Sequence, residues 1–221
     1  MKETNYKNFI IQFLGHAGFR VENPDLKISF AIDPFQVADV QPVDYIFISH
    51  SHYDHCDEIS IKKMMKPETK IIGPNDILAE LQDIASKIKT TFVGEEFVLG
   101  KLKITTIPSY NINKFRNPNE VFHTKEKGWQ GFIIETEGIR FYHAGDADFI
   151  PEMKELEKID VAFLPISGTY VMTVEEAVQA AIAIGPKLAI PMHFGKILGS
   201  SIDAQRYSNL LHGKVNVAVL S

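Results

Sequence analysis

The sequence predicts an α/β (α+β) fold, and two observations support this prediction. In the first half, apolar runs rich in Phe, Ile and Val are bounded by Gly, Asn and Pro, as is typical of strands, at residues 9–14, 19–22, 27–32 and 45–48. In the second half, a strand followed by a loop and a helix recurs three times, with strands expected at 139–143, 161–164 and 188–190. With 221 residues, we expect one domain over residues 1–221.

Two helices carry signals for where they begin. Thr173 and Glu176 have the spacing of a capping box, an apolar stripe follows at helical spacing, and Gly185 before a proline ends it. Asn75 is expected to cap a second helix, whose apolar residues at helical spacing continue as far as Ile88.

The bulk composition narrows the classes of partner. A net charge of −5 argues against a nucleic-acid or anionic-membrane surface. The single cysteine allows no internal disulfide, and no apolar run approaches the ~20 residues of a membrane helix. The polar N-terminus shows no signal peptide, so we expect a cytoplasmic protein that acts on a small-molecule substrate. Homo-oligomer formation is left open.

A cluster of histidines directly follows the apolar run 45–48. His50 and His52 are two residues apart, so in an extended segment they point to the same side. If the chain then turns, Asp54 and His55 face a second point nearby. Imidazole and carboxylate groups bind zinc, manganese or iron. The alternative is a surface cluster without metal, and both the upstream strand and the internal carboxylate weigh against it.

The pattern His-x-His-x-Asp-His after an apolar strand resembles the signature of the metallo-β-lactamase superfamily, and the resemblance covers nearly the full chain. The branch with L-ascorbate-6-phosphate lactonase and N-acylphosphatidylethanolamine phospholipase D looks closest. Its Gly-His pair is matched by Gly15 and His16, and its Asp-Pro strand end by Asp33 and Pro34. The resemblance implies a four-layer αββα sandwich with a metal site at one edge, between two mixed sheets.

The resemblance also implies a set of metal ligands. His50 and His52 would bind a first metal, and Asp54 and His55 a second. Asp146 matches the bridging carboxylate of the family, and His193 matches the last histidine of the second site. The implied cofactors are two divalent metal ions, with Zn²⁺ expected and Mn²⁺ or Fe as alternatives.

One position departs from the family pattern. The family supplies a third histidine to the first metal, and the residue that aligns with it here is Asn111, a poor zinc ligand. His123 lies twelve residues further, in the long polar stretch 109–128, which we expect to be functional or mobile. Either His123 is an ordinary solvated residue, or this loop brings it to the first metal or to a substrate oxyanion beside it.

Other residues near these motifs have less specific expectations. His16 is expected to pack or hydrogen-bond at the rim of the site, and Asp33 to orient a ligand histidine. Thr169 and Tyr170 follow a strand and precede the capped helix, where they could contact substrate. His143 alternates away from Asp146 and is expected to be structural.

The implied function is that of a metal-dependent hydrolase. A metal-bound hydroxide would attack an ester, lactone, amide or phosphodiester, while Asp54 or Asp146 orients the nucleophile and carries a proton. Lactonase-like and phosphodiesterase-like activities fit the resembled branch. Two alternatives stay open: an iron-binding oxidoreductase of the same fold, and a catalytically degenerate metal-binding module, which the Asn111 substitution would allow.

Overall fold

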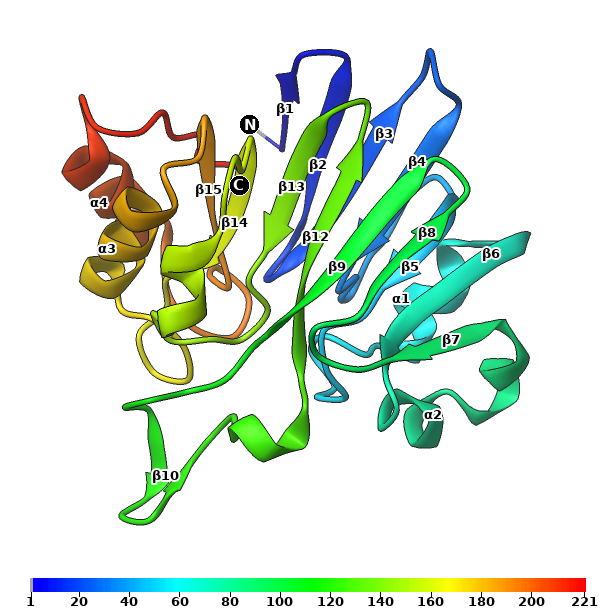
Figure 1. Ribbon diagram of the computed structural model, residues 1–221, viewed down its shortest axis with the longest axis horizontal. Helices are drawn as coiled ribbons and strands as arrows, with labels where there is room; N and C mark the ends of the chain where they lie inside the picture. Colours follow the sequence, from blue (N-terminus) through cyan, green and yellow to red (C-terminus); the bar gives the residue numbers. More distant parts are fainter. Residues whose placement is uncertain (1) are drawn as a thin grey trace.

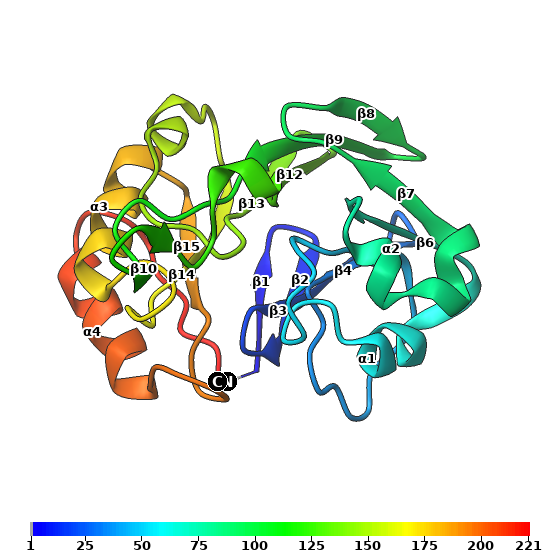
Figure 2. The same cartoon turned by 90° about the horizontal axis from the view of Figure 1, so that it is seen from below.

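Two mixed β-sheets face each other at the centre of the protein, and helices cover their outer faces (Figure 1). The computed structural model describes residues 2–221. Seen from below, the two sheets form the inner layers, with α1 and α2 outside one sheet and α3 and α4 outside the other (Figure 2). This arrangement confirms the predicted four-layer αββα sandwich.

The first sheet has seven strands in sequence order. Strands β1 to β4 are antiparallel neighbours, and β4 to β7 are parallel neighbours. Their bounds are β1 Glu3–Tyr6, β2 Phe9–Gly15, β3 Gly18–Asn23, β4 Ile28–Ile32, β5 Val43–Phe47, β6 Met65–Pro74 and β7 Ile88–Thr91.

The second sheet has six strands in the order β15-β14-β13-β12-β9-β8. The first three are parallel neighbours, and the remaining pairs are antiparallel. Their bounds are β8 Glu96–Leu99, β9 Leu102–Pro108, β12 Gln130–Thr136, β13 Ile139–His143, β14 Val161–Pro165 and β15 Leu188–Met192. The three predicted strand–loop–helix repeats therefore form the parallel part of this sheet.

The helices are short. The α-helices are α1 Glu58–Lys63, α2 Ile77–Glu80, α3 Val174–Ile184 and α4 Ser201–Leu211, and 3-10 helices span Gln82–Lys87, Lys125–Lys127 and Pro151–Glu155. Across residues 2–221, none of the helices has the length and apolar character needed to pass through a membrane.

Some strands have alternating buried and more exposed side chains and others are buried throughout, and their positions in the fold explain the difference. In β2 the inward side chains Phe9, Ile11 and Phe13 alternate with less buried ones, because only one face of this strand lies against the core. All five residues of β14 are buried, since helices cover one face of its sheet and the first sheet covers the other. Phe9 and Phe141 join the two sheets in an edge-to-face contact, with ring centroids 5.1 Å apart.

The two helix predictions have opposite outcomes. Both hydrogen bonds of the Thr173–Glu176 capping box are present, and Gly185 ends α3 in the left-handed conformation. The predicted Asn75-capped helix is wrong: α2 ends after one turn, a 3-10 helix follows, and Ile88 begins β7. Parallel pairing of Ile88 with Ile71 on β6 overrides the helical spacing of the apolar residues.

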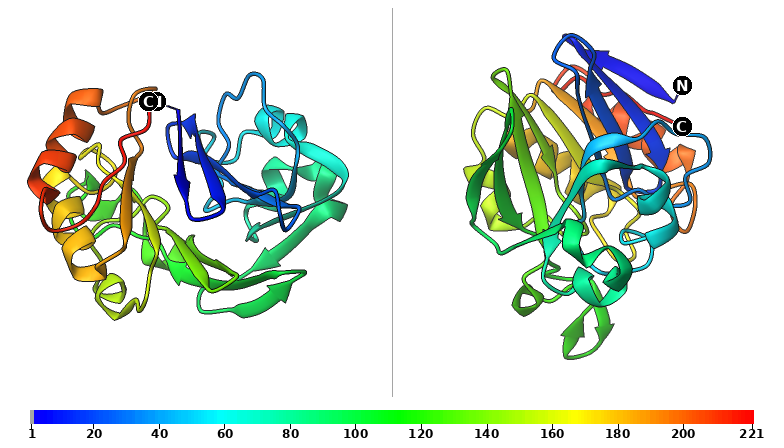
Figure 3. Two further views of the ribbon diagram at one scale, coloured as in Figure 1. Left: turned by 90° about the horizontal axis from the view of Figure 1, so that it is seen from above. Right: turned by 90° about the vertical axis from the view of Figure 1, so that its right-hand side faces the viewer.

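The polar stretch 109–128 contains a small hairpin. Its strands β10 (Phe115–Asn117) and β11 (Glu120–Val121) form a separate two-stranded sheet. The hairpin extends beyond one end of the two large sheets, as the third set of views shows (Figure 3).

Candidate functional site

The candidate site lies where several strands of both sheets end. His50 follows β5, Asp146 follows β13 and His193 follows β15 directly. The carboxyl ends of parallel strands meet at one edge of a sheet, so segments far apart in sequence meet there. From the first sheet, His16 in the β2–β3 turn and Asp33 after β4 complete the group.

The backbone at this edge adopts unusual conformations. His16, Asp33 and His193 have φ values of +55°, +43° and +60°, in the left-handed region that non-glycine residues rarely occupy. Gly145, before Asp146, has φ +61°, and a Cβ atom there would lie 2.8 Å from the Ser109 hydroxyl. Strained residues gathered at one place are typical of functional sites.

Three histidines form a first cluster. Ligand nitrogens of His50, His52 and His123 all lie within 4.8 Å of one another, and His50 Nε2 lies 3.0 Å from His52 Nδ1. The ring of Trp129 packs against all three imidazoles, with centroid distances of 4.9, 4.7 and 5.4 Å. Trp129 Nε1 donates a 2.6 Å hydrogen bond to Asp76, which fixes the indole.

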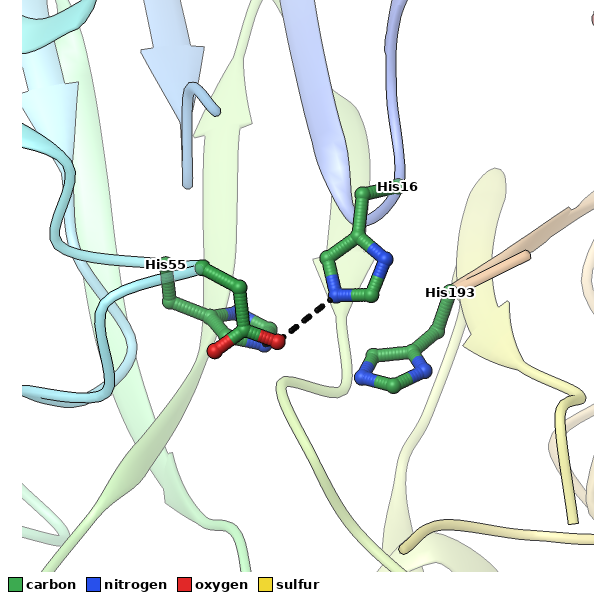
Figure 4. Close-up of side chains that lie close together, drawn as sticks. His16, His55 and His193 are labelled. Atoms are coloured by element: carbon green, nitrogen blue, oxygen red, sulfur yellow. Dashed lines mark hydrogen bonds and ion pairs between the residues drawn. The ribbon is translucent and has the colours of Figure 1, made fainter. Parts of the chain in front are cut away.

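Four residues form a second cluster. Ligand atoms of His16, Asp54, His55 and His193 lie within 4.8 Å of one another. Figure 4 shows His16, His55 and His193 converging from three separate segments of the chain. His16 Nε2 donates a 2.9 Å hydrogen bond to the Asp54 carboxylate. His16 is fully buried, so it lies inside the cluster and not at its rim.

Asp146 lies between the two clusters. One carboxylate oxygen is 3.2 Å from His55 Nε2. The other is 3.1 Å from His193 Nε2 and 3.4 Å from His123 Nε2. One carboxylate therefore reaches members of both groups, the position expected of a bridging ligand.

Several buried polar atoms in these clusters have no hydrogen-bond partner. They are His16 Nδ1, His55 Nε2, His123 Nε2, His193 Nε2 and one oxygen of Asp146. A buried polar atom without a partner costs free energy, so a convergence of such atoms calls for a common partner. Imidazole nitrogens and a carboxylate are the donor set of zinc and related ions, so these residues fit a metal.

Hydrogen bonds from the opposite ring nitrogens orient these imidazoles. His55 Nδ1 donates to Asp33 over 2.8 Å, and the Ser49 hydroxyl also donates to Asp33 over 2.6 Å. The same hydroxyl lies 2.9 Å from His50 Nδ1, and Ser167 lies 2.8 Å from His193 Nδ1. Such contacts leave Nε2 free for a metal. Sequence reasoning anticipated Asp33 but missed Ser49 and Ser167, for which the sequence holds no distinctive signal.

His123 is fixed by Asn111. The Asn111 amide oxygen accepts hydrogen bonds from the backbone N–H of His123 over 2.9 Å and from His123 Nδ1 over 2.8 Å. Because an amide oxygen only accepts, Nδ1 carries the proton and Nε2 presents its lone pair. His123 is 2% exposed, so the alternative of a solvated loop residue is wrong.

Burial and neighbouring charges together set the pKa values of the central groups. Burial by itself lowers the pKa of His55, but the Asp146 and Asp33 carboxylates outweigh it and raise that pKa well above its usual value. Burial raises the pKa of Asp146, but His193 and His55 hold it well below its usual range. The pKa of His123 falls to about 4, chiefly through burial. The centre therefore favours positive charge beside Asp146, which a metal cation would supply.

A cleft of about 260 Å³ opens over the two clusters. His52, Asp54, His123 and Asp146 form its floor, and its remaining lining residues are Tyr53, Arg116, Phe122, Tyr170 and Ile197. Tyr170 therefore lines the cleft, and its contact with substrate stays a prediction. Thr169 is exposed and does not line the cleft. His143 lies outside both clusters, and its Nε2 donates a 2.9 Å hydrogen bond to the carbonyl oxygen of Ala17.

Comparison with known proteins agrees with this geometry. Residues 10–193 match the family model described as "Beta-lactamase superfamily domain". The UPF0173 metal-dependent hydrolase of Alkaliphilus metalliredigens is 33% identical over 195 residues, which cover 83% of this chain and 84% of that protein. A candidate metal-dependent hydrolase from Parabacteroides distasonis has a crystal structure that is 29% identical, with a TM-score of 0.82 and coverage of 99% and 96% of the two chains.

A more distant likeness concerns the fold alone. The diiron β-hydroxylase CmlA of Streptomyces venezuelae superposes with a TM-score of 0.72 at 14% identity, over 99% of this chain and 54% of its own. The family match and the curated relative, by contrast, extend over most of this sequence and include the histidine cluster after β5. The chain therefore belongs to the metallo-β-lactamase superfamily, among its UPF0173 metal-dependent hydrolases.

Proposed function

We propose that this protein is a dinuclear zinc hydrolase that cleaves an ester, lactone or phosphodiester bond in a small molecule. One observation carries the proposal: buried, unpartnered ring nitrogens of His55, His123 and His193 converge on Asp146, whose own second oxygen is also unpartnered. Packing of a hydrophobic core does not explain why these polar atoms are buried together. Two metal ions bound among them would give every one of these atoms a partner.

The two clusters divide the ligands between the ions. His50, His52 and His123 would hold the first ion, and Asp54, His55 and His193 the second, with Asp146 serving both. The proximity of His123 to the other two histidines supports a complete first site despite Asn111. The alternative of a catalytically degenerate metal-binding module was based on Asn111 in place of a histidine ligand, and His123 can supply the ligand that Asn111 does not.

Two ions held by these residues would supply Lewis-acid chemistry: they would polarise the oxygen under attack and lower the pKa of a bound water. Two carboxylates line the cleft, those of Asp146 and Asp54, and the Asp54 side chain is the more exposed, at 14% against 4%. The His16 hydrogen bond fixes its orientation, and that bond together with the charge of His55 overcomes burial and lowers the Asp54 pKa to about 2. Asp54 is therefore ionised at neutral pH and available to orient a water and accept its proton.

The nitrogen and oxygen ligand atoms of the site are suited to zinc, and they can also bind other metal ions. A set of imidazoles and carboxylates suits Zn²⁺, and it also suits Mn²⁺ and Fe. The volume of the cleft, about 260 Å³, supports a small substrate. The resembled lactonase and phospholipase D branch supports lactones and phosphodiesters by analogy alone.

The test is metal analysis joined to an activity panel. Protein purified without added metal is analysed by mass spectrometry, stripped with chelator, and reloaded with Zn²⁺, Mn²⁺ or Fe²⁺. Each form is assayed on 4-nitrophenyl acetate, γ-butyrolactone and bis(4-nitrophenyl) phosphate. We expect two zinc ions per chain and hydrolysis that chelation abolishes and zinc restores. Iron as the native metal, with no hydrolysis by any form, would instead favour the oxidoreductase alternative.

A further inference from the structure

The wall of the cleft contributes a cation that the proposed metal chemistry does not use. Arg116 lies on β10 and lines the cleft together with Phe122 and Tyr170, above the floor formed by Asp146. Arg116 itself is exposed to solvent.

Arg116 has no anionic partner of its own. No carboxylate of residues 2–221 forms an ion pair with it, and its one specific contact is with Phe122, whose ring centroid lies 5.7 Å from the guanidinium carbon. Two of the three lysines of this segment have anionic partners. Lys114 pairs with Asp148 and Glu176, and Lys125 pairs with Glu152.

The hairpin that carries Arg116 is fixed at its base. Asp148 accepts hydrogen bonds from the backbone N–H groups of Ile112 and Asn113, over 2.6 and 2.8 Å. Buried Lys114 then joins Asp148 to Glu176 on α3. Because this base is anchored two residues before Arg116, the backbone of β10 that carries Arg116 is positioned beside the cleft.

Two aromatic side chains that line the cleft contact one another, and one of them also contacts Arg116. Phe122 meets Tyr170 edge to face, with ring centroids 4.6 Å apart, and Arg116 lies over Phe122. A guanidinium in cation–π contact with an aromatic ring keeps its N–H groups available, as suits recognition of a carboxylate or phosphate.

We infer that Arg116 is a specificity residue that binds an anionic oxyanion group, carboxylate or phosphate, carried by the substrate at a point separate from the scissile bond. The inference rests on the proposed function, in which the two metal ions would hold the reacting end. The substrate class becomes an ester, lactone or phosphodiester with an additional negative charge, whose carbon skeleton lies in the cleft against the paired rings of Phe122 and Tyr170.

A binding experiment tests this without any turnover. Zinc-loaded protein is titrated calorimetrically with butyrate, which has one carboxylate, and with succinate, glutarate and adipate, which have a second at increasing distance. We expect the best dicarboxylate to bind roughly tenfold tighter than butyrate. The variant Arg116→Gln should reduce that ratio to about one, and Arg116→Lys should retain part of it. Titration with 3-phosphonopropionate tells whether phosphate or carboxylate is the preferred group.

The matched control is Lys127→Gln. Lys127 is another cation of the same segment, over the ring of Trp129, and it does not line the cleft. The Lys127→Gln variant should leave the preference for the dicarboxylate over butyrate unchanged. An equal preference in wild type and Arg116→Gln, or an equal loss in Lys127→Gln, would overturn the assignment.

Kinetics separate this inference from the proposed function. We expect Arg116→Gln to raise KM roughly tenfold for 4-nitrophenyl hydrogen succinate and to leave 4-nitrophenyl acetate unaffected. If the wild type hydrolyses nothing but the dicarboxylate preference still depends on Arg116, only the hydrolase proposal fails. If hydrolysis is found but Arg116→Gln changes neither preference nor KM, only the Arg116 assignment fails.

Discussion

The Asn111 amide oxygen accepts two hydrogen bonds from His123, one from its backbone N–H and one from its ring Nδ1. The family resemblance aligns Asn111 with a histidine ligand, and here Asn111 instead fixes the tautomer and direction of His123, twelve residues further along the chain. The free Nε2 of His123 then joins His50 and His52.

We therefore predict that His123→Ala lowers the metal content from two ions per chain to one, because the first cluster loses one of three imidazoles. Asn111→Ala should weaken binding at that site by about 10–100-fold, since it removes only the orienting contact. The single tryptophan, Trp129, packs on all three imidazoles, so its fluorescence should report zinc binding there. The exposed His212 supplies the control, and His212→Ala should titrate like wild type. Two tightly held ions in His123→Ala would refute this ligand set.

Asp33 has a stability role as well as an orienting one. It is fully buried and accepts hydrogen bonds from His55 and from both the backbone N–H and the hydroxyl of Ser49. Asp33→Ala should lower the free energy of unfolding of the metal-free protein by about 3 kcal/mol, because it leaves buried polar partners unsatisfied. Urea unfolding measures this, with exposed Asp25→Ala as the control. Equal midpoints for the two variants would contradict the prediction.

Asp146 reaches both clusters, so its loss should affect both metal ions. We predict that Asp146→Ala binds the two ions more weakly and loses hydrolytic activity, whereas removal of a ligand from one cluster spares the other. Mass spectrometry of the metal content, with circular dichroism to check folding, makes the comparison with His123→Ala. Retention of one ion at wild-type affinity would show that Asp146 does not serve both sites.

Glu176 makes the anchorage of the hairpin pH-dependent. Burial raises its pKa, but Lys114, Asn113 and the Thr173 backbone N–H outweigh this and hold the pKa below its usual 4.5. A lowered folded-state pKa means that the stabilisation is complete above pH 4.5 and is lost as the pH falls through the folded value. Glu176→Gln should therefore be less stable than wild type by about 1 kcal/mol near pH 6, and the difference should shrink as the pH falls below 4.5. Urea unfolding at a series of pH values from 6 downward tests this, and a difference independent of pH would argue against it.

Local sequence signals predicted much of the fold and located several candidate ligands at the ends of strands. His50, Asp146 and His193 each follow a buried apolar strand, so the strand pattern placed all three at strand ends, whereas the family resemblance implied that they converge as ligands. The capping box of α3 is equally local and was confirmed. By contrast, the helical spacing after Asn75 was misleading, because the outcome depended on pairing between Ile88 and β6.

Contacts between segments that are distant along the chain could not be predicted from the sequence. The acceptor role of Asn111 depends on where the chain returns twelve residues later, and a sequence pattern gave only two open alternatives for His123. Ser49 and Ser167 orient ligand histidines through side-chain directions that no periodicity encodes. Arg116 lies on a three-residue strand, too short for an alternating pattern to assign its face.

The most direct test of the account is a crystal structure of the zinc-loaded protein, with anomalous diffraction measured at the zinc edge. We predict two peaks, one contacted by His50, His52 and His123 and the other by Asp54, His55 and His193, with Asp146 contacting both and zinc–nitrogen distances of about 2.0–2.1 Å. A single peak, or a first ion bound without His123, would contradict the dinuclear site proposed for this chain.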